Sequence, residues 1–221
     1  MDVIEAIKSR TTSRDFKSDP VSKETVLKIL EAANNCPSSG NSQPWQIYVA
    51  GRKDLDKITL ALMERHKKEI VHGTAEIPLP KEWPPALKER INQMHEERDK
   101  AQGITHMSDA DFRAYVEHIS RFCNAPVLIV ICMDKTLESW SIFSLGMLTQ
   151  NILLAAHHYG LATFPALSLV SHADIVRREL NIPADLKIVF GVALGYSNDT
   201  PINSFRSSKR PIKDVVIFRG M

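Results

Sequence analysis

Two short basic clusters carry the residue types that hold a phosphate group. The first occupies residues 10–14 and the second residues 206–210. In each, guanidinium or ammonium groups supply positive charge for a phosphate dianion, and hydroxyl groups donate to its remaining oxygens. Either cluster alone is a weak signal, because a basic run is more often a solvated surface. The residues are Arg10, Thr11, Thr12, Ser13 and Arg14, and then Arg206, Ser207, Ser208, Lys209 and Arg210.

A third feature is the loop Pro37–Trp45, which is dense in small polar side chains. One interpretation is a helix-to-strand connection built from residues that favour turns. The other is a row of donors and acceptors presented to a polar, planar ligand. Composition does not choose between the two, so both stay open at this point.

Other site chemistries find little support in the sequence. His157 and His158 are adjacent, so on a helix they point about 100° apart and make poor metal co-ligands. We therefore expect no metal site. The sequence has no G-x-S-x-G motif, and Cys36 is interpreted as a small buried thiol. It also has no G-x-G-x-x-G motif and no P-loop, which argues against a dinucleotide-binding Rossmann unit.

Composition narrows the class of protein further. A net charge of +2 over 221 residues disfavours a dedicated nucleic-acid binder. Three cysteines without a C-x-x-C pair indicate reduced thiols in a reducing compartment. The N-terminus lacks a signal-peptide pattern, and the apolar stretch 142–161 contains too many polar groups for a membrane span. We expect a cytoplasmic protein of one domain, without membrane or nucleic-acid partners.

Hydrophobic periodicity predicts a mixture of helices and strands. A charged helix over 86–101 is expected to lie on the surface or form a lid. The run 139–159 is apolar on nearly all sides, so we expect a partner subunit to supply part of its burial. Further helices are predicted over 2–9, from an N-cap at Ser22 to about 34, over 54–72, and from a capping box at Ser171–Asp174 to Leu180.

Strands are predicted over 45–50, 127–133 and 188–196, with a short last strand over 215–218. Four prolines exclude a regular element over 73–85. The segment 63–120 is therefore expected to be an excursion from the core. This pattern of elements predicts an α+β fold.

Three segments, in this order, resemble the flavin-dependent nitroreductase family, in particular its nitrobenzoate-reductase-like subgroup. The first is Arg10–Phe16, and the second is 33–45, which contains Pro-Ser-Ser-Gly-Asn-Ser-Gln-Pro-Trp. The third is the closing segment, with Gly195–Tyr196, Lys209–Ile212 and Asp214–Val216. The likeness extends from about residue 2 to 219 and is weakest over 60–120.

The resemblance implies a three-layer α/β/α sandwich around a central, mainly antiparallel sheet of four or five strands. It implies a single domain over 1–221, with a divergent helical excursion at about 63–120. It further implies an intertwined homodimer with FMN bound non-covalently at the interface, and a C-terminal strand that adds to the partner's sheet.

The resemblance also assigns roles to particular residues. Arg10 and Lys209 would contact the FMN phosphate, and Arg14 would approach the N1 and O2 edge of the ring. Residues 38–41 would reach the FMN of the other subunit, and 165–168 would lie along the ring with a backbone N–H near N5. The implied FMN-binding residues are Arg10, Thr11, Thr12, Arg14, Pro37, Ser38, Ser39, Asn41, Pro165, Ala166, Leu167, Ser168, Arg206 and Lys209.

The implied activity is the reduction of nitroaromatics or quinones by NADH or NADPH in a ping-pong scheme. The flavin would carry the chemistry, so no catalytic side chain is assigned. Trp83, Phe112 or Tyr115 are candidates to cover the ring. Two alternatives stay open: another flavin reaction on the same fold, such as reductive dehalogenation or enone reduction, and a non-enzymatic flavin-binding redox module.

Overall fold

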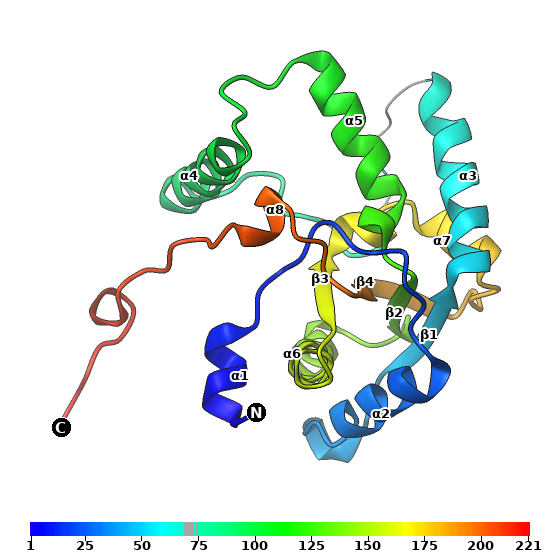
Figure 1. Ribbon diagram of the computed structural model, residues 1–221. Coiled ribbons are helices and arrows are strands. Elements are labelled where there is room, and N and C mark those ends of the chain that lie inside the picture. Colours follow the sequence, from blue (N-terminus) through cyan, green and yellow to red (C-terminus); the bar gives the residue numbers. More distant parts are fainter. Residues whose placement is uncertain (69–72, 74) are drawn as a thin grey trace.

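A four-stranded antiparallel sheet lies at the centre of the computed structural model, which describes residues 1–68, 73 and 75–221 (Figure 1). The strand order is β1-β2-β4-β3, with β1 at Gln46–Gly51, β2 at Val127–Asp134, β3 at Ala162–Ala166 and β4 at Leu186–Gly195. The strands predicted over 45–50, 127–133 and 188–196 are confirmed, each within two residues. The fourth strand, β3, escaped prediction because it is short and contains Pro165, which is tolerated at a sheet edge.

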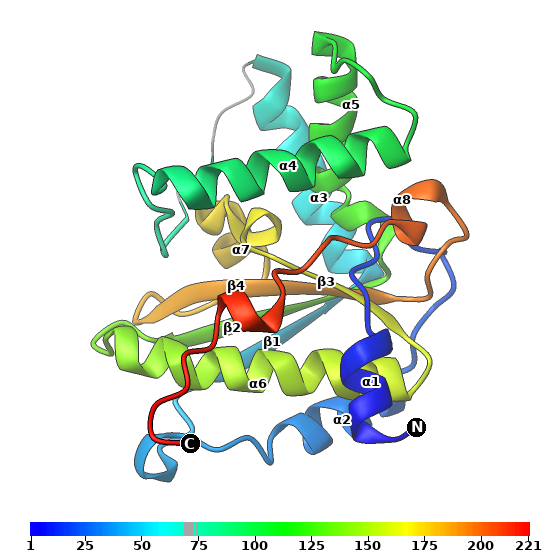
Figure 2. The same cartoon turned by 90° about the vertical axis from the view of Figure 1, so that its left-hand side faces the viewer.

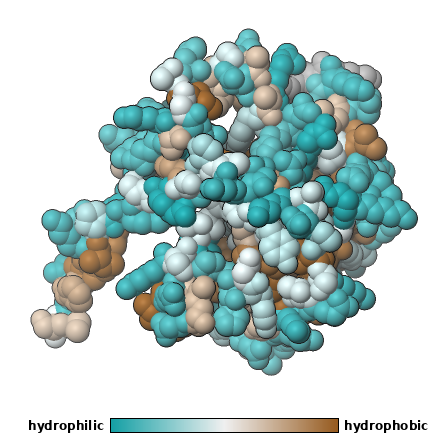
Figure 3. All heavy atoms as spheres, in the orientation of Figure 1, coloured by the Kyte–Doolittle hydropathy of each residue, from teal (hydrophilic) through white to brown (hydrophobic). Residues whose placement is uncertain are grey.

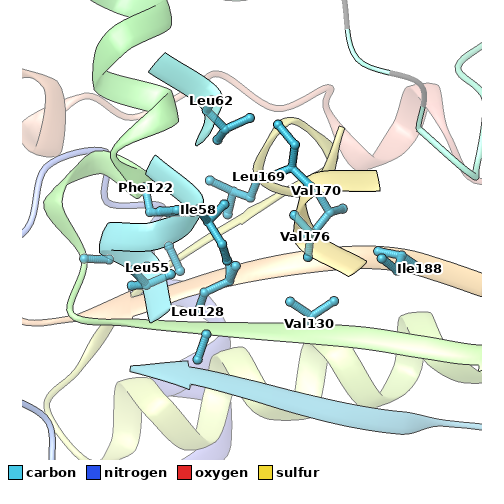
Figure 4. Packing of buried hydrophobic residues seen from close by; sticks show 14 of the residues in the cluster. Leu55, Ile58, Leu62, Phe122, Leu128, Val130, Leu169, Val170, Val176 and Ile188 are labelled. Carbon is cyan, nitrogen blue, oxygen red and sulfur yellow. The ribbon is translucent and has the colours of Figure 1, made fainter. Parts of the chain in front are cut away.

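The sheet is the middle of three layers. Side chains of β2 alternate between its faces, as the two-residue period of a strand requires. Ile129 and Ile131 pack towards α6 (Ser139–His158) and α2 (Lys23–Ala33). Leu128 and Val130 face the other side, towards α3 (Arg52–Lys68) and α7 (Ala173–Glu179), as Figure 4 shows. The predicted α/β/α sandwich is confirmed.

Two further helices lie on the same face of the sheet as α3 and α7 (Figure 2). The helix predicted over 86–101 is α4 (Pro85–Ala101), and none of its residues is buried. The second, α5 (Asp109–Ser120), was not predicted, although a capping box between Ser108 and Asp111 marks its start. The helix predicted over 54–72 is α3, and residues 69–72 of that prediction lie outside the described part of the chain.

The capping box predicted at Ser171 is wrong. The Ser171 hydroxyl donates instead to the carbonyl of Ser168, 3.0 Å away, which closes a short 3-10 turn, η3 (Leu167–Val170). As a result α7 begins one residue later than predicted, at Ala173, and the N-cap position moves from Ser171 to His172. The local hydroxyl–carbonyl bond outcompetes the cap, as short polar side chains commonly do.

The strand predicted over 215–218 is also wrong for this chain. After α8 (Pro201–Ser204), the C-terminal segment runs away from the body and forms only a 3-10 turn, η4 (Ile212–Asp214) (Figure 1). A strand needs a neighbouring backbone for its hydrogen bonds, and this segment reaches no edge of its own sheet. Its apolar side chains are exposed, with Ile217 79% and Phe218 71% accessible, and they give the protruding arm its brown colour in Figure 3.

The long helix α6 is not buried on all sides within this chain. Leu148 and Ile152 are fully buried against the sheet, but Trp140 and Phe143 near its start are 68% and 61% exposed. Their rings stack on one another at 5.7 Å. Within the described residues, no helix combines the length and apolar character needed to cross a bilayer.

Candidate functional site

The first basic cluster lies along the edge strand β3. Helix α1 (Val3–Ser9) ends at Arg10, and the next residues run beside β3. Thr12 forms a parallel bridge with Thr163, and the Ser13 N–H donates to the Thr163 carbonyl at 3.0 Å. The cluster is therefore held by backbone bonds at the sheet edge, which Figure 2 shows with α4 above it and α6 below.

One buried amide fixes this segment to the C-terminal part of the chain. The Arg14 N–H donates to Asn203 Oδ1 at 2.7 Å, and Asn203 Nδ2 donates to the Asp15 carbonyl at 2.7 Å. Ser13 also donates through its hydroxyl to Ser197, at 3.0 Å. Asn203 was not among the residues predicted from the sequence to form the site. Its only signal was an amide two residues after Pro201 in an otherwise featureless turn.

The two arginines of this cluster form no ion pair with any residue that the structure describes. Arg10 Nη1 is buried and has no hydrogen-bond partner within the described residues. Arg14 is more deeply buried, and its guanidinium lies 5.5 Å from the centre of the Phe164 ring. Burial lowers the pKa of both groups from the ordinary value. A half-buried guanidinium without a partner is costly, so the arrangement favours an anionic ligand.

A small chamber of about 280 Å³ adjoins Arg14, between α4, α5 and α8. Arg98 of α4 enters it, only 12% exposed, and holds Asp99 at 2.8 Å. Its guanidinium lies 5.8 Å from the centre of the Tyr115 ring. The charge of Arg98 also contributes, after burial, to the lowered pKa of Arg14. The sequence analysis predicted that α4 lies on the surface or forms a lid but did not single out Arg98.

A larger, mainly apolar cavity of about 680 Å³ lies between α3, α5 and η3. Leu167 and Ser168 form part of its wall, so it borders the segment predicted to lie along the flavin ring. Phe112 and Tyr115 of α5 line it from the opposite side, and each is about 40% exposed. Trp83, the third aromatic candidate, precedes α4 and is 38% exposed.

The loop predicted to reach the FMN of the other subunit lies far from Arg10 in this chain. Ser9 Oγ is 2.8 Å from His157 Nε2 near the end of α6, whereas the Cys36 thiol contacts the Ser144 carbonyl near its start. At a rise of 1.5 Å per residue, these points are about 20 Å apart. Figure 2 shows α1 and the turn η1 (Ser39–Asn41) near opposite ends of α6.

The loop has a defined shape nonetheless. The Gln43 N–H donates to Ser38 Oγ at 2.9 Å, and the Gln43 side chain donates to Asn41 Oδ1 at 3.3 Å. Gly40 and Asn41 adopt positive φ angles of 58° and 54°. These conformations favour glycine and asparagine. Pro37, Ser39, Gly40 and Asn41 are exposed, so the loop is free to face another molecule.

The second basic cluster lies beyond α8 and is exposed. Arg206 donates to the carbonyls of Asn203 and Phe205 at 2.8 and 2.9 Å. Lys209 is 3.5 Å from Ser207 Oγ, and Arg210 donates to the Asp214 carbonyl. Within this chain the second cluster makes no ion pair with described residues, and it stands on the protruding segment.

The thiols are poor nucleophiles. All three are buried and free. Burial raises the pKa of Cys123 and of Cys132 to about 12, and it also raises the pKa of Cys36. Because the thiolate is the reactive form, none of the three is prepared for attack at neutral pH. The interpretation of Cys36 as a structural thiol is therefore supported.

Comparison with known proteins agrees with this geometry. Residues 7–196 match the profile of the Nitroreductase family. The chain is 35% identical over 217 residues to nitrobenzene nitroreductase of Ectopseudomonas oleovorans, with 96% of this chain and 94% of that protein covered. It is 33% identical over 216 residues to chloronitrobenzene nitroreductase of Comamonas testosteroni, with the same coverage.

A solved structure extends the comparison to three dimensions. The FMN-dependent nitroreductase NfnB from Mycobacterium smegmatis, in complex with NADPH, superposes with a TM-score of 0.91. It is 28% identical and covers 98% of this chain, and 97% of that chain is matched.

Proposed function

Because the chain belongs to the nitroreductase family, we propose that it is an FMN-dependent oxidoreductase that uses NADH or NADPH to reduce nitroaromatic or quinone acceptors. The observation that carries the proposal is the pair of desolvated arginines at the edge of β3. Arg10 and Arg14 form no ion pair within the described residues, and Arg10 Nη1 is buried without a hydrogen-bond partner. Members of the family named above reduce nitrobenzene and chloronitrobenzene according to their names.

The residues present fit FMN. A phosphate group would give Arg10 the acceptor that its buried Nη1 lacks. Thr11 and Thr12 supply neighbouring hydroxyls on the phosphate or ribityl side. Arg206 and Lys209 supply further positive charge from the C-terminal segment, which a movement of that exposed segment would bring closer.

Arg14 is assigned to the pyrimidine edge of the flavin ring. It is half-buried, its guanidinium lies over the Phe164 ring, and its backbone N–H donates to Asn203. A fixed cation at that edge stabilises negative charge without reorganising at the moment of reaction. When bound, FMN supplies two-electron transfer, from NAD(P)H in one half-reaction and to the acceptor in the next.

Residues 165–168 are assigned to one side of the ring. Pro165 and Ala166 end β3, and Leu167 and Ser168 begin η3, so this segment is anchored on the sheet. Phe112 and Tyr115 face it across the larger cavity and would cover the ring and limit acceptor size. Trp83 is the weaker candidate for this role, because it does not line the cavity.

We propose that two copies of this chain complete each FMN site. The loop that follows Cys36 lies near the start of α6, whereas Arg10 lies near its end, about 20 Å away. The loop residues are therefore assigned to the partner's cofactor: Pro37, Ser38, Ser39 and Asn41. The exposed aromatic pair on α6 and the exposed apolar C-terminal segment support an intertwined homodimer. In that dimer, residues 215–218 would gain the sheet edge that they lack in one chain.

Two further expectations are kept as proposals. Residues 1–221 would form a single domain, with the segment at about 63–120 as the divergent excursion that shapes the acceptor pocket. The three free, buried cysteines support a reducing, cytoplasmic compartment.

Steady-state kinetics test the proposed activity. NADH or NADPH oxidation would be followed with a nitroaromatic, a quinone, an aryl iodide and an enone as acceptors. The proposal expects parallel double-reciprocal lines with the first two acceptors, as a ping-pong scheme requires. Bound FMN without oxidation by any acceptor would favour a flavin-binding module, and a clear preference for the iodide or the enone would change the reaction class.

A further inference from the structure

A hydrogen-bonded network of polar side chains lies in the wall of the larger cavity and joins the three helices α3, α5 and α7. Arg65 on α3 pairs with Asp174 on α7, through contacts of 3.0 and 2.6 Å. Arg65 Nη1 also lies 3.2 Å from His172 Nδ1, and His172 Nε2 lies 3.2 Å from His66 Nε2. His66 Nδ1 lies 3.4 Å from Ser120 Oγ on α5.

Hydrogen-bond chemistry fixes where the protons lie. Arginine is always a donor, so His172 Nδ1 must accept and its proton must be on Nε2. That N–H can then donate only to an unprotonated His66 Nε2, which places the His66 proton on Nδ1, facing Ser120. The Ser120 hydroxyl in turn donates to the Val116 carbonyl at 2.8 Å. With this placement of protons both imidazoles are neutral, and every ring nitrogen has a hydrogen-bond partner.

These hydrogen-bonded side chains hold the corner that follows β3, residues 167–171, in place. His172 is the N-cap residue of α7, and the Ser171 hydroxyl ties the same corner to the Ser168 carbonyl. Leu169 and Val170 are buried beneath it. The histidine pair therefore joins residues 167–172 to α3 and α5, on the wall of the cavity that Leu167 and Ser168 also line.

A second proton on either ring would break one hydrogen bond of this network. On His66 it would lie on Nε2, directly opposite the N–H of His172. On His172 it would lie on Nδ1, opposite the Arg65 guanidinium. The charged groups that the described residues place against the pair are Arg65 from α3 and Asp174 from α7, and Asp174 is already engaged by Arg65. Burial, the largest cause, lowers the pKa of both histidines.

We propose that His66 and His172 are positioning residues whose neutral pair holds the Leu167–Ser171 corner in its cofactor-binding geometry, and that protonation of either ring releases it. The part of this inference that concerns the cofactor rests on the proposed function. The part that concerns protonation of the histidine pair is independent of the proposed function, because neither histidine is among the proposed cofactor contacts.

The first test reads the protons directly and needs no cofactor. Long-range ¹H–¹⁵N correlation spectra of the histidine rings would be recorded on the whole protein at pH 7.5. The inference expects His66 protonated on Nδ1 and His172 protonated on Nε2. The opposite tautomer on either ring, or a charged ring at this pH, would overturn it.

The second test measures the consequence for the corner. FMN dissociation constants would be compared at pH 7.5 and 5.5 for the native protein, the double variant His66→Gln/His172→Gln, and the exposed control His106→Gln. Glutamine keeps hydrogen bonding but does not titrate in this range. The FMN phosphate also titrates near pH 6, so only the difference between proteins is informative.

If the pKa of a histidine differs by one unit between the held and the released state of the corner, acidification changes the ratio of released to held protein by about tenfold. The native protein and the control should therefore lose several-fold more affinity at pH 5.5 than the double variant. Equal losses in all three proteins would overturn the positioning role. If FMN does not bind any of them while the tautomers are as expected, the proposed function fails and the neutral pair stands.

Discussion

Replacing Arg10 by methionine should move cofactor affinity and stability in opposite directions. The aliphatic stem of arginine packs much as methionine does, but the charge and the donors disappear. In the cofactor-free protein, Arg10 Nη1 is buried without a partner in the described part of the chain. The substitution therefore removes an unfavourable feature of the free protein and a favourable contact of the complex.

The magnitudes follow from that geometry. A hydrogen bond to a charged group contributes about 2 kcal/mol, so Arg10→Met should weaken FMN binding about 30-fold. An unsatisfied buried donor costs at least about 1 kcal/mol, so the cofactor-free variant should be more stable by about that amount. For a chain of this length, that raises Tm by about 2–4 °C.

Two assays separate the effects. Fluorescence titration gives the FMN dissociation constant, and thermal unfolding of the cofactor-free protein gives Tm. Arg113→Met on α5 is the matched control, because Arg113 is an exposed arginine, and it should change neither quantity appreciably. Unchanged FMN affinity in Arg10→Met would refute the phosphate assignment, and a lower Tm without cofactor would refute the desolvation argument.

Three further changes test other parts of the structure. Arg177 Nη2 lies 2.7 and 2.8 Å from the two carboxylate oxygens of Glu76, and this ion pair is about one-fifth exposed. Glu76→Gln should therefore cost about 2 kcal/mol in thermal unfolding, whereas Glu117→Gln, which breaks an exposed ion pair with Arg121, should cost less than about 0.5 kcal/mol. A mixed dimer of Ser39→Ala and Arg10→Met chains should regain one intact FMN site by titration, and no recovery would refute the shared site. Deleting 212–221 should shift sedimentation toward the monomer, and an unchanged dimer would show that this segment is dispensable for association.

The arrangement of the core was largely predictable from sequence. The apolar run 127–133 and the long apolar helix 139–158 dictate a central strand and a buried helix, because few other structures bury so much apolar surface. The elements that were missed or misplaced are α5 and several short elements. β3 has five residues and a proline, and the start of α7 depends on whether Ser171 bonds forwards or backwards along the chain.

The site was predictable only in part. The types and spacing of Arg10–Arg14 predict a phosphate ligand, and among the described residues Arg10 and Arg14 form no ion pair. Arg98 and Asn203 gave no such signal, because their importance comes from segments that meet only in the folded chain. The resemblance assigns the 37–45 loop to the FMN of the other subunit, but only the length of α6 gives the distance between this loop and Arg10 within one chain.

The most direct test of the central claim is an anaerobic absorbance spectrum of the FMN-loaded protein before and after addition of NADH or NADPH. We expect flavin bands that persist through gel filtration and bleach when the nicotinamide is added. A protein that retains no FMN, or one whose flavin bands stay unchanged with both nicotinamides, would contradict it.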